Sequence, residues 1–348
     1  MTWLFYVAKG YSISIVAPLV SYAESQGIRI AFFVSEKVDR VLPEMWRQFP
    51  VYTDLKSAIH FCPQFVLCPG NFVDFRLPGI KVELFHGIGI EKPVHYKIRH
   101  FFDLYLTSGP VVTDRFNEMK KKYGYFEVVE TGWPKMDAIL GFDSTDIRSH
   151  SNIPEDKRVV LYAPTHSKQM QSAEALLPAL SRIMAKDEIW LFKPHEFMDQ
   201  NLMHDVSLLD PKRFRLIRAH DITPWLHLAD VMVSDTSSVV YEFMALNKPV
   251  ITYRTMDRFD KGINIQCTEQ LRDALDRSFS NPMEFEEQRN RHLSEVNPRL
   301  DGSVAKTIFE TLQAIDPDKP LGIRRKPLNL FRKMQVLYHS RFKKGYLR

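Results

Sequence analysis

The residues best suited to chemistry form the block SDTSS at positions 234–238, which directly follows an apolar run. The run predicts a buried strand over 231–234, and the next residues predict a helix over 237–246 with Asp235 as its N-cap. Backbone N–H groups and the hydroxyls of Ser237 and Ser238 then converge at the positive end of a helix, a setting that suits a diphosphate. Glu242 lies one turn beyond Ser238, where a carboxylate accepts hydrogen bonds from ribose hydroxyls. The alternative is a well-capped core helix in which Asp235 and the serines serve the cap alone.

A second candidate is His86, which follows a predicted strand over 81–85 and begins the sequence His-Gly-Ile-Gly. Open α/β sheets place functional groups at the carboxyl ends of their strands, and Gly87 and Gly89 allow the backbone to approach a ligand closely. An imidazole there acts as a general base on a hydroxyl nucleophile or stabilises a phosphoryl group. The alternative is a hydrogen-bonded structural histidine.

Three further groups follow predicted strands. A predicted strand over 189–192 is followed by Lys193 and His195, whose donors would neutralise the charge of a leaving phosphate. The alternative is a surface turn that begins at Pro194. Thr165 opens a Thr-His-Ser-Lys sequence after a strand over 159–163. The segment 131–137, with Gly132 and Pro134, is predicted mainly as a structural exit from the first domain.

Short apolar runs alternate with segments of helical period from the start of the chain, a pattern typical of βαβ units and a parallel sheet. We predict a Rossmann-like domain over residues 1–138, a polar linker over 139–156, a second Rossmann-like domain over 157–319 and a tail over 320–348. Two such domains with parallel sheets facing a cleft form the α/β arrangement called GT-B. No P-loop, nucleophile elbow or zincin motif is present.

Composition narrows the class of protein further. The chain has 348 residues, 45% of them hydrophobic, which excludes collagen-like and disordered chains. Three cysteines without a C-x-x-C pair indicate a reduced protein without structural zinc. The N-terminus lacks the features of a signal peptide, and no apolar run is long enough for a transmembrane helix.

Seven motifs together resemble the CDP-glycerol glycerophosphotransferases of teichoic-acid and capsule synthesis. They cover about residues 80–315 in the family's order: HGIGIEK (86–92), TSGP (107–110), ETGWPKMD (130–137), VVLYAPTH (159–166), FKPH (192–195), SDTSSVVYEFMALNKPVITY (234–253) and DGS (301–303). The block from 234 to 253 is the most specific of them.

The resemblance implies a GT-B transferase that attacks the β-phosphorus of CDP-glycerol with an acceptor hydroxyl and releases CMP. His86 and His195 are then the catalytic residues, as base and phosphate ligand. The donor diphosphate is expected at Thr236, Ser237, Ser238 and Lys193, and the nucleotide at Glu242, Asp235 and Thr165. The expected acceptor is lipid-linked or a glycan, no nucleic acid is expected as partner, and no cofactor is expected to be required, with Mg²⁺ left open.

Departures from the family pattern leave the donor open. Phe85 stands where the family usually has Trp, Thr236 where it has Tyr, and Lys135 where it has Arg, and Thr165-His166 stands near a usual Trp-Arg pair. CDP-ribitol or another activated polyol phosphate therefore remains an alternative donor. Two other functions also stay open: a UDP-N-acetylglucosamine 2-epimerase, which shares the two-domain plan, and a nucleotide- or polymer-binding protein without turnover.

The net charge of +5 is concentrated in the tail. Residues 320–348 contain nine Lys or Arg and no Asp or Glu, so the remainder of the chain is mildly acidic. The basic residues of the tail that we expect to contact a membrane are Arg324, Arg325, Lys326, Arg332, Lys333, Lys343 and Lys344. Leu330, Phe331, Met334, Leu337, Tyr338 and Phe342 recur at helical spacing, which predicts a basic amphipathic helix on an anionic leaflet. The alternative is that this apolar stripe packs back onto the domains. We expect a cytoplasmic protein, peripheral at the inner face of the bacterial membrane.

Overall fold

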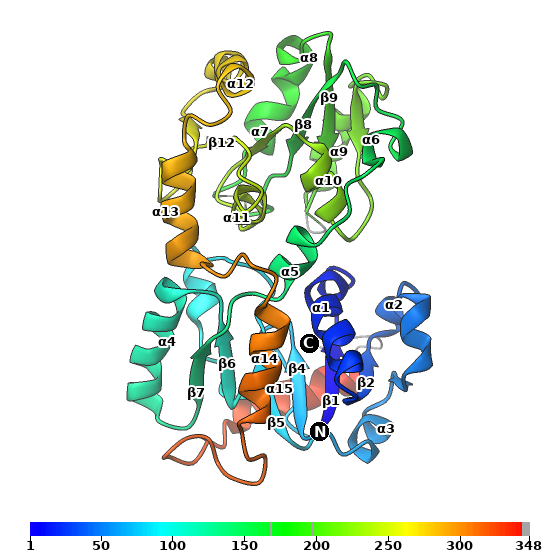
Figure 1. The fold of residues 1–348 in the computed structure, drawn as a ribbon, viewed down its shortest axis with the longest axis vertical. Coiled ribbons are helices and arrows are strands. Elements are labelled where there is room, and N and C mark those ends of the chain that lie inside the picture. The colour runs from blue at the N-terminus through cyan, green and yellow to red at the C-terminus, as the bar shows by residue number, and fades with distance from the viewer. Residues whose placement is uncertain (168, 196–197, 343–348) are drawn as a thin grey trace. The chain divides into compact units, whose positions relative to one another are not determined.

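The structure, a computed structural model, describes residues 1–167, 169–195 and 198–342 (Figure 1). The chain forms two compact units. The first comprises residues 1–138 and 295–348, and the second comprises residues 139–294. The chain passes between them within α5 (Lys135–Leu140) and within α13 (Glu286–Val296).

The first unit is built on a seven-stranded sheet. Its strands are β1 (Thr2–Val7), β2 (Arg29–Val34), β3 (Val51–Tyr52), β4 (Phe65–Cys68), β5 (Ile80–Glu83), β6 (Leu104–Thr107) and β7 (Glu127–Glu130). Their spatial order is β3-β2-β1-β4-β5-β6-β7, and each neighbouring pair is parallel. From β1 the successive strands are added on one side up to β3, and from β4 onward they are added on the other side. This is the Rossmann strand order, and its switch point lies between β1 and β4.

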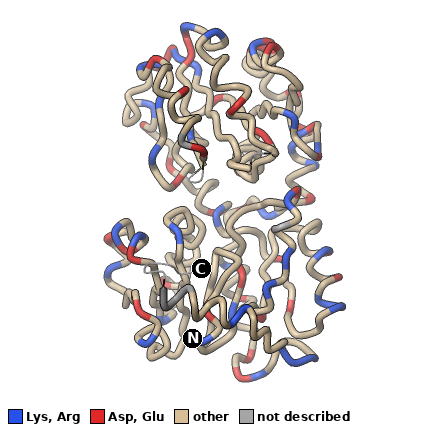
Figure 2. Tube along the Cα trace, turned by 180° about the vertical axis from the view of Figure 1, so that it is seen from behind, with Lys and Arg blue, Asp and Glu red and all other residues tan. Residues whose placement is uncertain are grey.

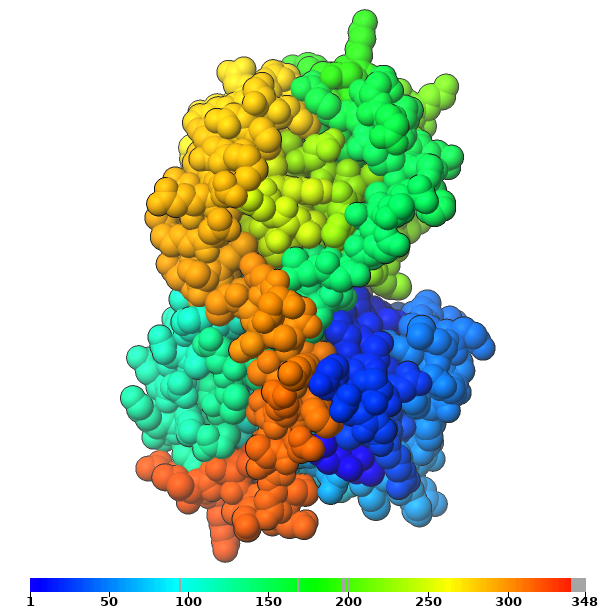
Figure 3. Space-filling model, viewed as in Figure 1, coloured from blue at the N-terminus to red at the C-terminus, as the bar shows by residue number. Residues whose placement is uncertain are grey.

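The helices of the first unit cover this sheet. They are α1 (Ser12–Ser25), α2 (Glu36–Asp39), α3 (Leu55–His60), α4 (Pro110–Tyr123), α14 (Val304–Gln313), α15 (Leu330–Phe342) and the short 3₁₀ turns η1 (Glu44–Gln48) and η2 (Pro93–Tyr96). Trp3 and Phe309 lie with ring centroids 6.2 Å apart, and Tyr22 of α1 also packs on Phe309. Helices α1 and α14 therefore share one core with β1, and Figure 3 shows their surfaces side by side.

The second unit repeats the plan with six parallel strands. They are β8 (Arg158–Tyr162), β9 (Glu188–Phe192), β10 (Phe214–Leu216), β11 (Val231–Ser234), β12 (Val250–Tyr253) and β13 (Ile263–Ile265), in the order β10-β9-β8-β11-β12-β13. The helices are α6 (Ile147–His150), α7 (Ala173–Leu176), α8 (Leu180–Ile183), α9 (Gln200–Ser207), α10 (Thr223–Leu228), α11 (Val239–Met244), α12 (Leu271–Ser280), α13 and the 3₁₀ turns η3 (Leu177–Ala179) and η4 (Thr268–Gln270). The switch point of this sheet lies between β8 and β11.

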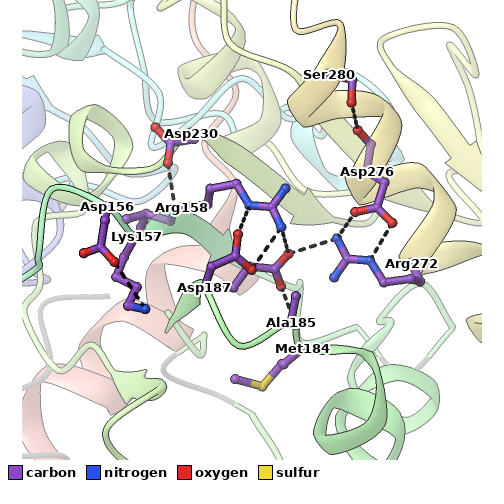
Figure 4. A network of polar contacts seen from close by, with 12 residues as sticks. Asp156, Lys157, Arg158, Met184, Ala185, Asp187, Asp230, Arg272, Asp276 and Ser280 are labelled. Atoms are coloured by element: carbon purple, nitrogen blue, oxygen red, sulfur yellow. Dashed lines mark hydrogen bonds and ion pairs between the residues drawn. The ribbon is translucent and has the colours of Figure 1, made fainter.

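A buried carboxylate anchors the amino end of the second sheet (Figure 4). Glu188, at the start of β9, is fully buried, and one of its oxygens pairs with Arg158 at 3.3 Å and Arg272 at 2.9 Å. Its other oxygen accepts from the Ala185 N–H and the Trp190 indole N–H. Because a buried charge is tolerated only when it is fully partnered, this network fixes the sheet at the edge opposite the carboxyl ends of the strands.

The C-terminal boundary differs from the predicted one. The sequence places residues 295–319 in the second domain, whereas the structure places them in the first unit. The Asp137 carboxylate accepts from the N–H groups of Val304 (3.2 Å) and Ala305 (2.8 Å) and so caps α14 from a distance in sequence. The Trp133 N–H donates to Asn297. Because of these contacts, residues 295–319 belong to the first unit although they directly follow α13 in sequence.

The segment 139–156, predicted as a linker, is instead part of the second unit in the structure and packs on it. The Arg215 guanidinium donates to the carbonyls of Ser151 and Asn152, and His227 bonds the Ile139 carbonyl at 2.7 Å. The segment contains α6. It is therefore part of that unit's surface.

Candidate active site

The predicted donor residues gather at one edge of the second sheet. Parallel pairing aligns Tyr162 of β8 with Phe192 of β9 and with Val233 of β11. Thr165, Lys193 and Asp235 come three, one and two residues after these aligned positions, so they all leave the carboxyl edge. This edge includes the switch point between β8 and β11, where open α/β sheets bind ligands.

Asp235 does not cap the helix, so that prediction is wrong. Helix α11 begins only at Val239 and has Ser238 as its N-cap. The fully buried Asp235 carboxylate instead accepts from the N–H of Thr165 at 2.9 Å, and from both the N–H and the hydroxyl of Ser172 at 2.9 Å. It therefore ties the loop after β8 to the loop after β11, across the switch point.

Thr236 has a similar bridging contact. Its hydroxyl oxygen accepts from the Met256 N–H at 3.1 Å, and the side chain is buried. Ser237 and Ser238 are half-buried just before α11, and the Ser237 N–H donates to the Asp235 carbonyl. Glu242 is buried within α11. Diphosphate binding by the serines and by Thr236 and ribose binding by Glu242 stay predictions.

Two imidazoles stack at the same edge. The rings of His166, after β8, and His195, after β9, have centroids 3.9 Å apart and planes at 31°. Ring N–H groups of paired histidines suit the oxygens of a phosphate. The sequence offered His166 only as one member of a polar run, and its contact with His195 depends on the pairing of β8 with β9. Lys168 and Glu196, which border these histidines in sequence, lie outside the described residues.

His86 follows β5 in the first unit, on a backbone turn that is itself unusual. Phe85 is buried at φ +60°, a left-handed conformation that bulky residues rarely adopt. The Trp133 indole N–H donates to the Phe85 carbonyl at 3.2 Å and holds this turn. Gly132, at φ +87°, has the left-handed backbone that glycine adopts without strain. The motif at 130–137, predicted as a domain exit with Pro134 buried before α5, thus also supports the histidine.

His95 is a neighbour that the sequence analysis missed. Its ring lies 6.3 Å from the His86 ring and stacks on Phe85, and a side chain at Gly89 would touch it at 3.4 Å. Burial, and then His86 and the cations Arg99 and Lys92, lower the pKa of His95 to about 3. The pKa of His86 is lowered as well, mostly by the protein atoms packed around its ring and to a smaller extent by the cations Arg99 and Lys92. The His86 side chain nevertheless keeps contact with solvent. Both rings are therefore neutral near pH 7.

Glu83 is the second residue that was missed. It ends β5 and is buried, and this burial raises its pKa to about 8 against the opposing effect of Arg99. A carboxylate at the end of the strand that leads to His86 is the signal that would have identified it.

The basic tail attaches to the first unit. The Arg324 guanidinium donates to the Lys122 carbonyl at 3.2 Å, and the Lys326 ammonium donates to the Phe101 carbonyl and pairs with Asp103. Arg332 and Lys333 lie over the rings of Phe72 and Phe75. Four of the predicted membrane-contacting cations thus have protein partners, whereas Arg325 is exposed and Lys343 and Lys344 lie outside the described residues.

The apolar stripe of α15 faces outward in the structure. Phe331 is 77% exposed and Met334 is 64% exposed, and Leu330, Leu337 and Tyr338 are exposed as well. The alternative, in which this stripe packs back onto the domains, is therefore wrong for these five residues. Figure 2 marks the basic and acidic residues along the chain.

Membrane-spanning helices and metal-ion clusters are both absent from the described residues. Over 1–167, 169–195 and 198–342, no helix is both long and apolar enough to cross a membrane. In the same part of the chain, no cluster of three or more His, Cys, Asp or Glu is placed to hold a metal ion. The expectation that no cofactor is required stays a prediction.

The two Rossmann-type sheets define the GT-B fold, as predicted. The solved structure of the wall teichoic acid polymerase TagF matches with a TM-score of 0.67 and 16% identity, over 90% of this chain and 88% of that chain. UDP-GlcNAc 2-epimerase from Neisseria meningitidis, bound to UDP-GlcNAc, matches with a TM-score of 0.59 and 14% identity, over 90% of this chain and 100% of that one. At these identities the likeness is one of fold.

The family is indicated by sequence. Residues 94–260, just under half of the chain, match the model of the CDP-Glycerol:Poly(glycerophosphate) glycerophosphotransferase family, which confirms the predicted resemblance. The teichoic acid glycerol-phosphate transferase of Staphylococcus aureus (strain NCTC 8325 / PS 47) is 24% identical over 216 residues, 53% of this chain and 54% of that protein. The matched segments span from 20% to 54% of the curated relatives' lengths. The predicted epimerase alternative has support from fold alone.

Proposed function

We propose that this protein transfers glycerol phosphate, or a related polyol phosphate, from a CDP-activated donor to a hydroxyl of a lipid-linked or glycan acceptor and releases CMP. The observation that carries the proposal is the convergence at the switch point of the second sheet. There His166 and His195 stack on each other, and Asp235 connects the loop after β11 to the loop that carries Thr165 and His166. All of these residues lie inside the region that matches the family.

The reaction is an in-line displacement at the donor's β-phosphorus. The acceptor oxygen forms a new P–O bond, and the bond from phosphorus to the bridging oxygen breaks with its electron pair leaving on CMP. The acceptor proton passes to His86, whose neutral ring has a lone pair to receive it. Donors at Lys193, His195, Ser237 and Ser238 offset the negative charge that grows on the leaving phosphate. No covalent enzyme intermediate is needed, so positioning supplies most of the rate.

We also propose that the protein acts in the cytoplasm, at the inner face of the bacterial membrane, through α15. The exposed apolar stripe and the basic tail are the chemistry that binds an anionic leaflet. That location suits an acceptor whose lipid stays in the bilayer.

The test is release of CMP from CDP-glycerol and from CDP-ribitol, with lipid-linked and soluble polyol-phosphate acceptors. His86→Ala and His195→Ala are expected to lower the rate at least ~100-fold, the usual size of a lost acid–base or charge-stabilising group. His60→Ala, an exposed histidine on α3, is the matched control and should change nothing. Assays with and without EDTA settle whether Mg²⁺ is required.

The proposal fails if no acceptor supports CMP release, or if both histidine variants match the His60 control. Conversion of UDP-N-acetylglucosamine to its 2-epimer without any acceptor would establish the epimerase instead. Tight calorimetric binding of CDP-glycerol without transfer to any acceptor would indicate a binding protein without turnover.

A further inference from the structure

A pocket of about 390 Å³ lies at the carboxyl ends of β6 and β7, entirely within the first unit. The residues that line it are Ser108, Glu130, Gly132, Pro298, Arg299, Leu300 and Asp301. They come from three motifs that are far apart in sequence, at 107–110, 130–137 and 301–303, and from the segment just before the last of these. Its volume is in the range of small-ligand sites.

The pocket shares an edge with His86. Strand pairing aligns Glu83 of β5 with Tyr105 of β6, so His86 and Ser108 each stand three residues beyond an aligned position. Gly132, on the pocket wall, precedes the Trp133 that holds the turn before His86. A ligand in the pocket therefore lies at the same end of the sheet as the proposed base.

Arg299 supplies a cation with spare hydrogen-bonding capacity. Among the described residues its guanidinium makes one hydrogen bond, to the Ser303 hydroxyl at 3.3 Å, and no ion pair. The side chain is half-buried, and its stem runs beside Gly132, where an added Cβ would lie 3.2 Å from the Arg299 Cβ. A guanidinium has five N–H donors, so most of these remain available to a ligand.

Ser108 supplies a further donor, beside the start of α4. Ser108 is 7% exposed, lines the pocket, and its hydroxyl makes no hydrogen bond within the described residues. The 14-residue helix α4 begins next to it with Gly109 as N-cap, without a side-chain cap and without an acidic residue in its first turn. The Ser108 hydroxyl is therefore available to a ligand in the pocket, and the positive end of the α4 dipole beside it favours an anion.

Two carboxylates complete the lining and narrow the ligand class. Glu130 and Asp301 are exposed, and each already accepts hydrogen bonds, from Thr113 and Ser303 respectively. Their oxygens also suit ligand hydroxyls, whereas their charge disfavours a free phosphate dianion. The combination fits a singly charged phosphodiester flanked by polyol hydroxyls.

We propose that this pocket binds a polyol phosphodiester, the terminal linkage of a poly(polyol phosphate) acceptor. Arg299 and Ser108 donate to the phosphate near the positive end of α4, and Glu130 and Asp301 accept hydrogen bonds from the polyol hydroxyls. The assignment of this ligand as the acceptor rests on the proposed function.

The probe is glycerophosphoglycerol, with binding to the full chain followed by calorimetry. Arg299→Gln is expected to weaken its affinity about tenfold or more, as loss of a charge-assisted hydrogen bond does, and Ser108→Ala severalfold. Arg299→Lys keeps the charge and should retain part of the affinity. Arg182→Gln, an exposed arginine on α8, is the matched control and should bind the probe normally. All variants should bind CDP-glycerol as the unmutated protein does.

The pocket assignment is overturned if the unmutated protein does not bind the probe, or if folded Arg299→Gln and Ser108→Ala both bind it with unchanged affinity. Equal binding of inorganic phosphate would reduce the site to a simple anion site and overturn the polyol part. CMP release distinguishes the two proposals. A protein that binds the probe but transfers to no acceptor refutes the function and leaves the pocket, whereas transfer with an unchanged acceptor KM in Arg299→Gln refutes the pocket alone.

Discussion

The carboxylate of Asp235 receives the backbone N–H of Thr165 at 2.9 Å, although the two residues are 70 positions apart. The same carboxylate receives two donors from Ser172. One buried side chain thus fixes the loop that carries Thr165 and His166 relative to the loop that carries Ser237 and Ser238. Under the proposed function, we expect donor binding at the switch point to depend on this connection.

Asp235→Asn tests that dependence. The amide keeps the shape but turns an NH₂ toward groups that are themselves donors, so we expect a loss of about 1–3 kcal/mol in the free energy of unfolding and a raised KM for CDP-glycerol. Urea unfolding and CMP-release kinetics measure the two effects. Asp199→Asn, at the exposed N-cap of α9, is the control for an ordinary Asp-to-Asn change. Unchanged stability and KM in Asp235→Asn would contradict the role.

Trp133→Phe tests the turn before His86. The change removes the indole N–H that holds the Phe85 carbonyl, so the strained turn relaxes and His86 shifts. We expect kcat to fall about tenfold or more while the donor KM stays the same, since misplacement of a reacting group affects the chemical step. Trp225→Phe is a matched control, because the Trp225 indole N–H is buried and has no partner among the described residues, so its loss frees no carbonyl there. Equal kcat in the two variants would show that the indole bond has no bearing on catalysis.

Glu83 should make stability depend on pH. Its pKa is about 8 in the folded protein and near 4.5 when unfolded, so the unfolded state releases the proton first as the pH rises. Stability then falls between those values by up to about 1.4 kcal/mol per pH unit. His95 acts oppositely but only below pH 6.5, its unfolded value, because its lowered pKa makes the folded state lose stability as the pH falls.

The clean window for Glu83 is therefore pH 6.5 to 8. Urea unfolding across it should show a decline in the unmutated protein and in Glu36→Gln, an exposed control on α2. Glu83→Gln should give a nearly flat profile and greater stability at pH 8. Parallel profiles for the protein and Glu83→Gln would exclude the effect.

Local patterns in the sequence predict most of the framework. The strand expected over 231–234 is β11, and the strands expected over 159–163 and 189–192 agree with β8 and β9 to within one residue at each end, because these apolar runs are continuous. β3 and β13 were missed because two or three residues carry no period. The helix expected over 237–246 is shorter at both ends, because α11 begins at Val239 and ends at Met244.

The errors in the site share one physical cause, which is contact between distant positions. Asp235 was assigned to a local cap because its real partners, Thr165 and Ser172, precede it by 70 and 63 residues. The return of α14 to the first unit depends on Asp137, more than 160 positions earlier. The sequence makes His86 and His195 candidates because a strand's carboxyl end is a local signal, whereas His95 and Arg299 become candidates only once the strands are paired.

The last prediction concerns the exposed face of α15. Inserting Phe331 and Met334 into a leaflet would stabilise the bound state by about 1.5–3 kcal/mol each, and the basic tail adds attraction that salt weakens. The double variant Phe331→Ser/Met334→Ser should therefore lose sedimentation with vesicles containing phosphatidylglycerol. CMP release with a soluble acceptor should persist, because neither side chain is packed in the core.

A matched pair controls for the loss of exposed apolar surface. Met45 and Leu208 are 64% and 71% exposed, close to the values for Met334 and Phe331, and lie elsewhere on the chain. Met45→Ser/Leu208→Ser should sediment with anionic vesicles as the unmutated protein does. High salt should release this variant and the unmutated protein from the vesicles, and neither should bind phosphatidylcholine vesicles. If the α15 variant sediments as strongly as this control, the apolar face does not bind the membrane, and any remaining attraction must come from the basic residues of the tail.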